Sequence, residues 1–204
     1  MITNLGKLNP KIYMSSLIKL KNFISEMKAM DKITINLNYS ATKDNHPFFG
    51  KMTKSYYDFA NSRRRRNPLI KELGLGVALI NLPNDFDQYF SSIESSARRN
   101  YRKSIKNKYR FSRFNYNDRL DDIWDINRST TYRQGKMPES IIKHRPEPIN
   151  NGESKTNFHD YLYYGVFSQD DKLVAYLGIL LAGDIAMIGN IYGHADHQSN
   201  GVVP

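Results

Sequence analysis

The densest group of side chains able to do acid–base chemistry is the run His194-Ala195-Asp196-His197. An imidazole with an ordinary pKa near ~6.5 can take a proton from an ammonium and leave an amine that attacks a carbonyl. Two other interpretations remain open, namely a metal site and a plain surface turn. The remaining histidines, at positions 46, 144 and 159, are scattered, so we expect no metal. His194, Asp196 and His197 are therefore the candidate catalytic residues.

A second group, Tyr132-Arg133-Gln134-Gly135, closes an expected helix. The forked guanidinium of Arg133 can bind a carboxylate or a phosphate through two hydrogen bonds, and Gln134 can donate to an acyl oxygen. Equally, an arginine in a last helical turn complements the helix dipole, and Gly135 is an ordinary C-cap. We take Tyr132, Arg133 and Gln134 as candidate substrate-binding residues, together with Asn190 on the last expected strand.

Positive charge is concentrated in the first half of the chain. The formal net charge is +10, but residues 1–110 carry 21 Lys and Arg against 8 Asp and Glu. On a helix, Arg99, Arg102 and Lys103 fall along one stripe, which would present cations to a polyphosphate or an RNA backbone. Four arginines at 63–66 follow three aromatic residues at 56, 57 and 59 and raise the same possibility. A solvated basic surface is the alternative for both segments.

Composition excludes several classes of protein. The chain has no cysteine, so disulfides, thiolate nucleophiles and cysteine-ligated metals are excluded. The N-terminus lacks the continuous apolar segment of a signal peptide, and this predicts a cytoplasmic protein. The most apolar stretch, residues 173–183, is about half the ~20 residues that a bilayer span needs, so we expect no membrane span.

The order of expected elements predicts an α+β fold. Hydrophobic spacing indicates helices at 10–30, 86–107 and 118–134 and a short strand at 33–37. Residues 41–68 and 136–158 carry turn residues and are expected to be irregular. One sheet, with the helices at 86–107 and 118–134 packed on it, should contain strands at 76–82, 109–116, 161–167, 172–181 and 185–192. The last three should form an antiparallel meander. We expect an N-terminal helical and irregular extension at 1–70 and a domain at 71–204.

From about residue 73 onward the chain resembles GNAT-like acyltransferases, in the branch related to the Fem-type peptidyl transferases. The resemblance is carried by residues 78–82, 97–106 and 126–138 and by the run from Gly193 to His197 before Gly201. It implies a mixed sheet that splays around an acyl-CoA or an aminoacyl-tRNA. It also implies direct attack by an amine, with backbone N–H groups stabilising the oxyanion and no protein nucleophile.

The family's pyrophosphate loop is similar to the segment that begins at Gln198. Gln198 and Gly201 match its first two positions, whereas Val203 stands where Gly or Ala is expected. We take Gln198, Gly201, Arg99, Arg102 and Lys103 as candidate cofactor-binding residues. In the family this loop leads into a helix, and without a further helix and strand the expected sheet would keep an open apolar edge. We expect this C-terminal helix and strand to be missing from the 204 residues, with little or no turnover.

The sequence thus predicts an acyltransferase that moves an acyl or aminoacyl group to a small-molecule or peptide amine. Its co-substrate would be acyl-CoA or an aminoacyl-tRNA, and tRNA or another nucleic acid is a candidate partner. The alternative is a non-enzymatic basic module that binds RNA or DNA through residues 63–66 and 98–110. A module that contacts phosphates loses affinity steeply with salt, which separates the two hypotheses.

Overall fold

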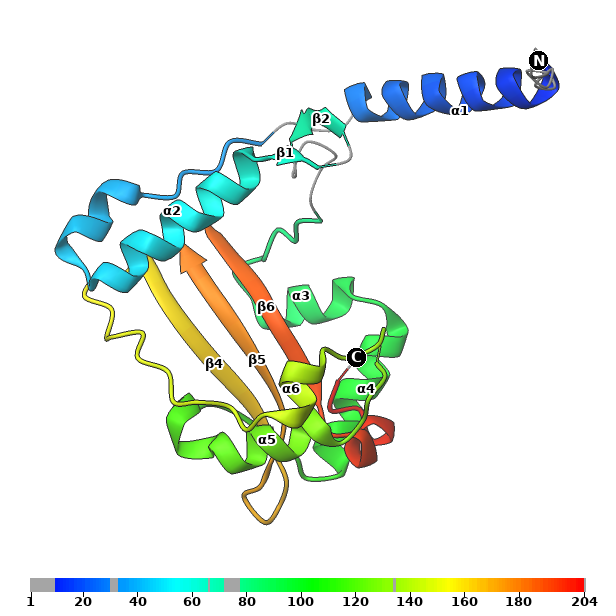
Figure 1. Cartoon of the computed structure of the whole chain (residues 1–204). Helices are drawn as coiled ribbons and strands as arrows, with labels where there is room; N and C mark the ends of the chain where they lie inside the picture. The colour runs from blue at the N-terminus through cyan, green and yellow to red at the C-terminus, as the bar shows by residue number, and fades with distance from the viewer. Residues whose placement is uncertain (1–9, 30–32, 66, 72–77, 134, 204) are drawn as a thin grey trace, which may run out of the picture. The chain divides into compact units, whose positions relative to one another are not determined.

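The computed structural model describes residues 10–29, 33–65, 67–71, 78–133 and 135–203 (Figure 1). The chain divides into two compact units. The first unit contains Met1–Thr34 and Tyr56–Ile80, and the second contains Ile35–Ser55 and Asn81–Pro204. The sequence predicted one domain boundary after residue 70. In the structure, residues 35–55 belong to the second unit, together with residues 81–204. The boundary near residue 55 falls within a helix.

The first unit contains α1, Pro10–Ala29, as the apolar spacing predicted. It also holds an antiparallel hairpin of β1, Arg63–Arg64, and β2, Asn67–Lys71. Two of the four consecutive arginines therefore lie in a strand, and Arg66 lies outside the described residues.

The prediction of an irregular segment at 41–68 was wrong. This segment holds part of the 3-10 helix η1, Tyr39–Asp44, and the whole of α2, Pro47–Asn61. Proline at the first helical position is favourable because its missing N–H would have no intrahelical partner there. Phe49 and Thr53 lie four residues apart on the buried face of α2. This i, i+4 pair was the helical signal that the turn residues concealed.

The second unit is built on a four-stranded antiparallel sheet in the order β3-β4-β5-β6. Figure 1 shows β4, β5 and β6 side by side. Its strands are β3, Arg110–Arg113; β4, His159–Phe167; β5, Leu173–Ala182; and β6, Ile185–Gly193. The predicted meander is confirmed, because β4 pairs with β5 and β5 with β6, both antiparallel. The fold is α+β, as predicted.

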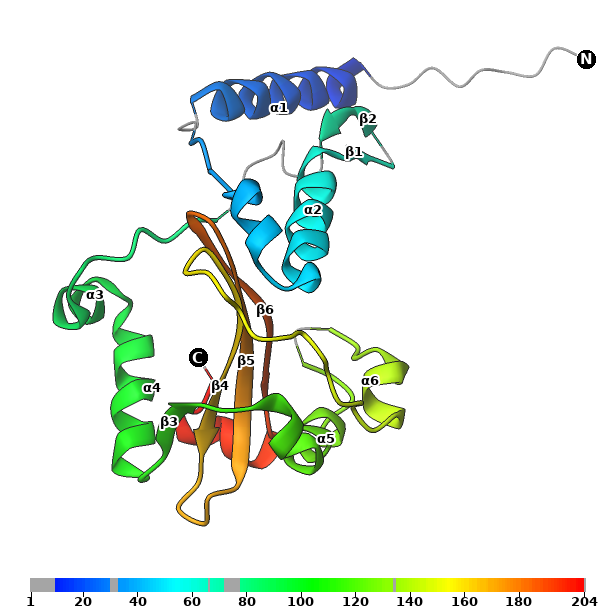
Figure 2. The ribbon, with the colours of Figure 1, turned by 90° about the vertical axis from the view of Figure 1, so that its left-hand side faces the viewer.

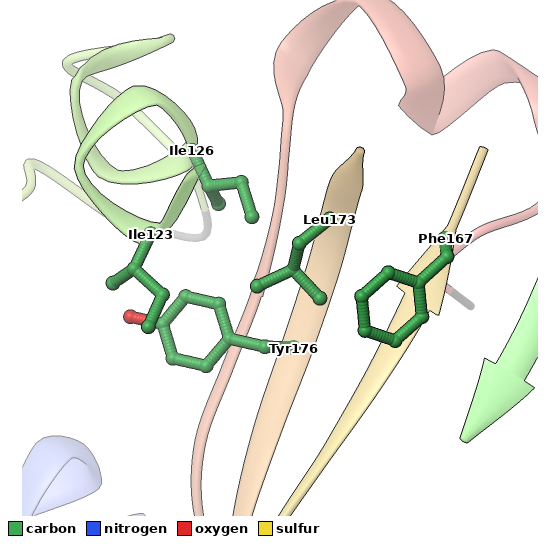
Figure 3. Close-up of a cluster of buried hydrophobic side chains, with 5 residues drawn as sticks. All are labelled: Ile123, Ile126, Phe167, Leu173 and Tyr176. Atoms are coloured by element: carbon green, nitrogen blue, oxygen red, sulfur yellow. The ribbon is translucent and has the colours of Figure 1, made fainter. Parts of the chain in front are cut away.

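Helices lie on both faces of this sheet. Figure 2 shows α4, Ser95–Lys106, on one side, and α5, Leu120–Arg128, with α6, Glu139–Lys143, on the other. The core under α5 consists of five buried side chains, drawn in Figure 3: Ile123, Ile126, Phe167, Leu173 and Tyr176. A second core cluster contains Val174, Ala175 and Val202. Leu173 and Val174 thus serve different clusters, as expected for neighbours that point to opposite faces of a strand.

Residues 35–55 are attached to the far end of the sheet through the β5–β6 turn. The Asn36 N–H donates to Asp184 Oδ2 over 3.1 Å, and the Asp184 N–H donates to the Asn36 carbonyl over 2.9 Å. The buried His159 donates from Nε2 to the Leu37 carbonyl over 2.9 Å. The predicted strand at 33–37 is wrong, because the bonds at Asn36 and Leu37 attach the segment without building a ladder.

The predicted strand at 76–82 is also wrong over its described part, residues 78–82. Residues 76 and 77 lie outside the described residues. Leu79, Ile80 and Leu82 are 46%, 69% and 71% exposed. An apolar run becomes a strand only where a neighbour offers hydrogen bonds and a surface to pack on, and this run pairs with neither edge of the sheet.

The long helix predicted at 86–107 is two helices, α3, Phe86–Ser92, and α4. Ile93 and Glu94 adopt extended backbone between them. The Arg98 guanidinium donates to the carbonyls of Ser91 and Ile93 over 2.8 and 2.5 Å, so a cation satisfies the C-terminal end of α3. Such a contact at a turn is invisible to hydrophobic spacing.

The helix predicted at 118–134 is also shorter than expected. It consists of the 3-10 helix η2, Tyr116–Arg119, followed by α5, which ends at Arg128. Beyond it the Ser129 hydroxyl donates to the Ile126 carbonyl over 2.8 Å. The region 136–158 is irregular as predicted, apart from α6. Among the described residues, no helix combines the length and apolar character that a bilayer span requires.

These assignments give a matched test of stability. Leu173→Ala should lower the free energy of unfolding by about 2–5 kcal/mol, because it opens a cavity in the core under α5. Leu82→Ala should change it by less than about 0.5 kcal/mol, because that side chain is exposed. Urea denaturation of both variants measures the difference. An equally large loss of unfolding free energy for Leu82→Ala would contradict the exposed position of Leu82 and support the predicted buried strand at 76–82.

Candidate functional site

The candidate site lies at the C-terminal end of β6, where the chain turns into the 3-10 helix η3, Ala195–Asn200. Two side chains from the segment after α5 hold this end of the strand. The Ala195 N–H donates to Ser129 Oγ over 3.0 Å. The Arg133 guanidinium donates from Nη1 to the Gly193 carbonyl over 2.5 Å and from Nη2 to the Ile126 carbonyl over 2.9 Å. One arginine thus ties α5 to β6.

Arg133 is a half-buried cation whose partners are neutral. No ion pair of Arg133 is found among the described residues, and its buried Nε has no hydrogen-bond partner there. The guanidinium carbon lies 5.5 Å from the centroid of the Tyr192 ring. Burial lowers the pKa of Arg133, but from a value so high that the group stays charged at neutral pH. Its positive charge is therefore not neutralised by a carboxylate.

A cavity of about 740 Å³, which we call the basic cavity, opens beside Arg133. Its described lining contains two cations and no acidic residue: Tyr132, Arg133, Gly135, Lys136, Met137, Gly189, Ile191, Tyr192, Gly193, Gln198 and Val203. Two segments about 60 positions apart meet in it. The charge of the described lining is therefore positive, and its polar side chains include Arg133, Lys136 and Gln198.

His194 lies at the start of η3 and caps it. Its Nδ1 accepts from the Asp196 N–H over 3.3 Å, and its Nε2 lies 3.7 Å from Asp125 Oδ2. A hydrogen bond from Lys172, 2.6 Å away, holds the pKa of Asp125 below its usual range, so this carboxylate is charged. Asp196 itself is exposed, with 85% of its side chain accessible. His194 therefore has a capping role, with one ring nitrogen already in use.

His197 also has one ring nitrogen in use, and it differs from His194 in that its contact is a phenol hydroxyl. Its Nδ1 lies 2.6 Å from the Tyr109 hydroxyl, which also accepts from Asn200 Nδ2 over 3.1 Å. Burial, and then the neighbouring His194, lower the pKa of His197. The ring is therefore neutral at neutral pH, which is the form that accepts a proton. Neither histidine lines the basic cavity, but the residue after His197 does.

The structure brings together three predicted residues, Tyr132, Arg133 and Gln198, in the basic cavity. Gln134 lies outside the described residues. Asn190 is exposed on β6 and does not line this cavity. The predicted phosphate contacts Arg99, Arg102 and Lys103 are exposed on α4, and they do not line it either.

Gly201 has a structural reason to be glycine. Its φ is +81°, and an added Cβ would lie 2.3 Å from the carbonyl oxygen of Asn100 on α4. The turn after η3 therefore packs directly against α4, which an L side chain would prevent. This contact brings the basic helix next to η3.

Among the described residues, no three of His, Asp and Glu gather in a way that could hold a metal ion.

Sequence reasoning missed a second cavity, of about 860 Å³, which we call the tyrosine cavity. It contains three tyrosines, an ion pair and several amide side chains; the lining is Arg113, Phe114, Asn115, Tyr116, Asn117, Ile149, Asn150, Asn151, Gly152, Glu153, Ser154, Asp160, Tyr161 and Tyr163. The alternating tyrosines of β4 and the nearby asparagines were the available signal. Their distance in sequence hid the fact that they face one space.

Comparisons of the chain with protein-family models, with curated proteins and with solved structures found no match.

The lowered pKa of His197 predicts a pH dependence of stability. A histidine whose folded pKa lies below its unfolded value costs stability once the unfolded chain takes up a proton, so stability falls as the pH drops below about 6.5. His197→Asn keeps an amide near the position of Nδ1 and removes the titration. Its free energy of unfolding should fall less between pH 7.5 and pH 5 than that of the unchanged protein. Equal losses in urea titrations would contradict the shift.

Proposed function

We propose that this protein transfers an acyl or aminoacyl group from an anionic donor to an amine. The observation that carries the proposal is the guanidinium of Arg133, a charge with no carboxylate partner among the described residues, at a cavity without acidic lining. An acyl-CoA or an aminoacyl-tRNA carries phosphates that match this charge. Lys136 and Gln198 are the other contacts proposed for the donor.

The chemistry needs only a proton acceptor and positioning. The amine nitrogen attacks the acyl carbonyl, and the bond from the carbonyl carbon to sulfur or oxygen breaks. The leaving sulfur or oxygen takes up the proton that the amine loses, so the donor leaves as a thiol or an alcohol. We assign to His197 the proton that the amine loses, because its ring is neutral and it precedes the cavity-lining Gln198 in the chain. A chain without cysteine fits a reaction that forms no acyl-enzyme.

A second candidate function, nucleic-acid binding, is favoured by a different observation. Neither α3 nor α4 contains a buried residue. Phe86 stacks on Phe90 with ring centroids 5.6 Å apart, and Arg102 lies 5.7 Å from the Phe90 centroid. Phe86 and Tyr101 are 56% and 45% exposed. Exposed rings beside basic side chains that form no ion pair among the described residues are the combination that single-stranded nucleic acids bind through stacking and charge.

Thiol release tests the acyltransferase. Because the chain has no cysteine, a thiol reagent reports only the thiol that leaves an acyl-CoA donor. Lys136→Ala and Gln198→Ala should each weaken donor binding about threefold to tenfold, since a lost polar contact of about 1 kcal/mol corresponds to that factor. Lys155→Ala, an exposed lysine outside the cavity, should leave it unchanged.

Donor binding is measured by calorimetry, and transfer by amine-dependent thiol release. Thiol release that needs both donor and amine supports the proposal. No binding of acyl-CoA or aminoacyl-tRNA, or equal effects of Lys136→Ala and Lys155→Ala, would overturn it.

Fluorescence polarisation with a single-stranded oligonucleotide tests the second candidate. Replacement of Arg99, Arg102 and Lys103 by Ala should reduce the slope of log affinity against log salt by about 0.7 for each lost phosphate contact. The control replaces Lys19, Lys21 and Lys28 on α1, which removes the same charge from another helix. Identical slopes for both triple variants would show that the stripe on α4 is a solvated surface.

A further inference from the structure

The tyrosine cavity differs from the basic cavity in the sign of its charge. Three charged residues line it, two acidic and one basic. Arg113 and Asp160 form an ion pair of 3.6 Å, so they largely neutralise one another. Glu153 is exposed, and no ion pair of Glu153 is found among the described residues. In a chain with a net charge of +10, this cavity therefore keeps one unpaired carboxylate.

Three tyrosine rings line the cavity, and the ring of Tyr163 contacts the other two. The centroids of Tyr116 and Tyr163 are 4.7 Å apart, and those of Tyr161 and Tyr163 are 5.1 Å apart. Burial raises the pKa of Tyr116 and of Tyr163, so both phenols stay neutral. Neutral aromatic faces attract a cation through their quadrupole, and most strongly where water is partly excluded.

The wall and floor around these rings are held in place. Asn117 donates from Nδ2 to the Ile149 carbonyl and accepts from the Ile149 N–H, both over 2.8 Å. The Tyr161 N–H donates to Asp160 Oδ1 over 2.8 Å, which fixes that carboxylate at the rim. The side chains of Asn150 and Asn151 have no such bonds among the described contacts, so their amides are available to a ligand.

Tyr161 also connects the two cavities. Its hydroxyl oxygen lies 3.0 Å from the position of a Cβ on Gly178 and 3.4 Å from that of a Cβ on Gly189. Gly189 lines the basic cavity, whereas Tyr161 lines the tyrosine cavity. The ring thus lies across β5 toward β6, over two positions that have no side chain. The Tyr161 side chain, which lies over Gly178 and Gly189, therefore lies between the two cavities.

We propose that the tyrosine cavity binds an organic ammonium, with the rings of Tyr116 and Tyr163 and the carboxylate of Glu153 as its contacts. The ammonium head would lie between the carboxylate and the rings, and its body would meet the amides of Asn150 and Asn151. Identifying this ammonium with the acyl acceptor rests on the proposed function, but its binding does not.

The experiment measures binding without any acyl donor. Phenethylammonium is titrated by calorimetry against phenethyl alcohol, which has the same ring and no charge. The ammonium should bind at least about tenfold more tightly, because the alcohol forms neither the ion pair nor the cation–π contact. Glu153→Gln should weaken the ammonium about threefold to tenfold and leave the alcohol unchanged. Glu147→Gln makes the same change outside the cavity and should leave both unchanged.

Substitutions at a ring separate this ligand from a neutral one. Tyr116→Phe keeps the face and should preserve ammonium binding, whereas Tyr116→Leu removes it and should weaken binding about threefold or more. Amide shifts at 150–153 in NMR spectra locate the ligand even if Tyr116→Leu unfolds. Equal binding of ammonium and alcohol, tight binding of glucose instead, or equal effects of Glu153→Gln and Glu147→Gln would overturn the proposal.

The two proposals fail separately. Ammonium binding without thiol release would support the ammonium site and contradict the proposed acyltransferase function. Thiol release without specific ammonium binding here would do the reverse.

Discussion

A single guanidinium holds the end of β6 to the helix beside it. Arg133 donates to a carbonyl at the end of the strand and to another in the last turn of α5, and it does so without a carboxylate. If a buried arginine pairs with an acidic side chain, the carboxylate neutralises its positive charge. Paired with backbone carbonyls, it fixes the geometry and keeps its net charge. Arg133 thus supplies both the contact that holds the end of β6 and one of the two positive charges that line the basic cavity.

The two cavities of the second unit divide the charge between them. Arg133 and Lys136 line one, while Glu153 and the Arg113–Asp160 pair line the other. The two linings thus carry opposite charge, and Tyr161 of the tyrosine cavity places its hydroxyl 3.4 Å from the position of a Cβ on Gly189, which lines the basic cavity.

Local pattern was enough to predict the meander, whose strands pair with their neighbours in sequence, whereas it missed the local helix α2. The meander has short turns at Asp171 and Gly183, both with positive φ, and its strands are adjacent along the chain. It was predicted correctly for that reason. The run at 76–82 has a strand's composition, but a strand needs a partner, and the described part of this run has none. The composition of a segment does not show whether it pairs with a strand that is distant in sequence.

The candidate site was predictable in its residue types and unpredictable in its geometry. Arg133 and Gln198 were chosen for their chemistry, and the fold places both at one cavity. Gly201 was chosen as part of a phosphate loop, although its φ and the approach of Asn100 already require glycine there. The tyrosine cavity had no compact motif, because its members come from the end of β3, from η2, from the irregular segment 149–154 and from β4. A site whose residues come from distant segments can be recognised only when the pairing and register of the strands are known. Tyr161 can reach Gly189 only because Gly178 lies between them on the middle strand.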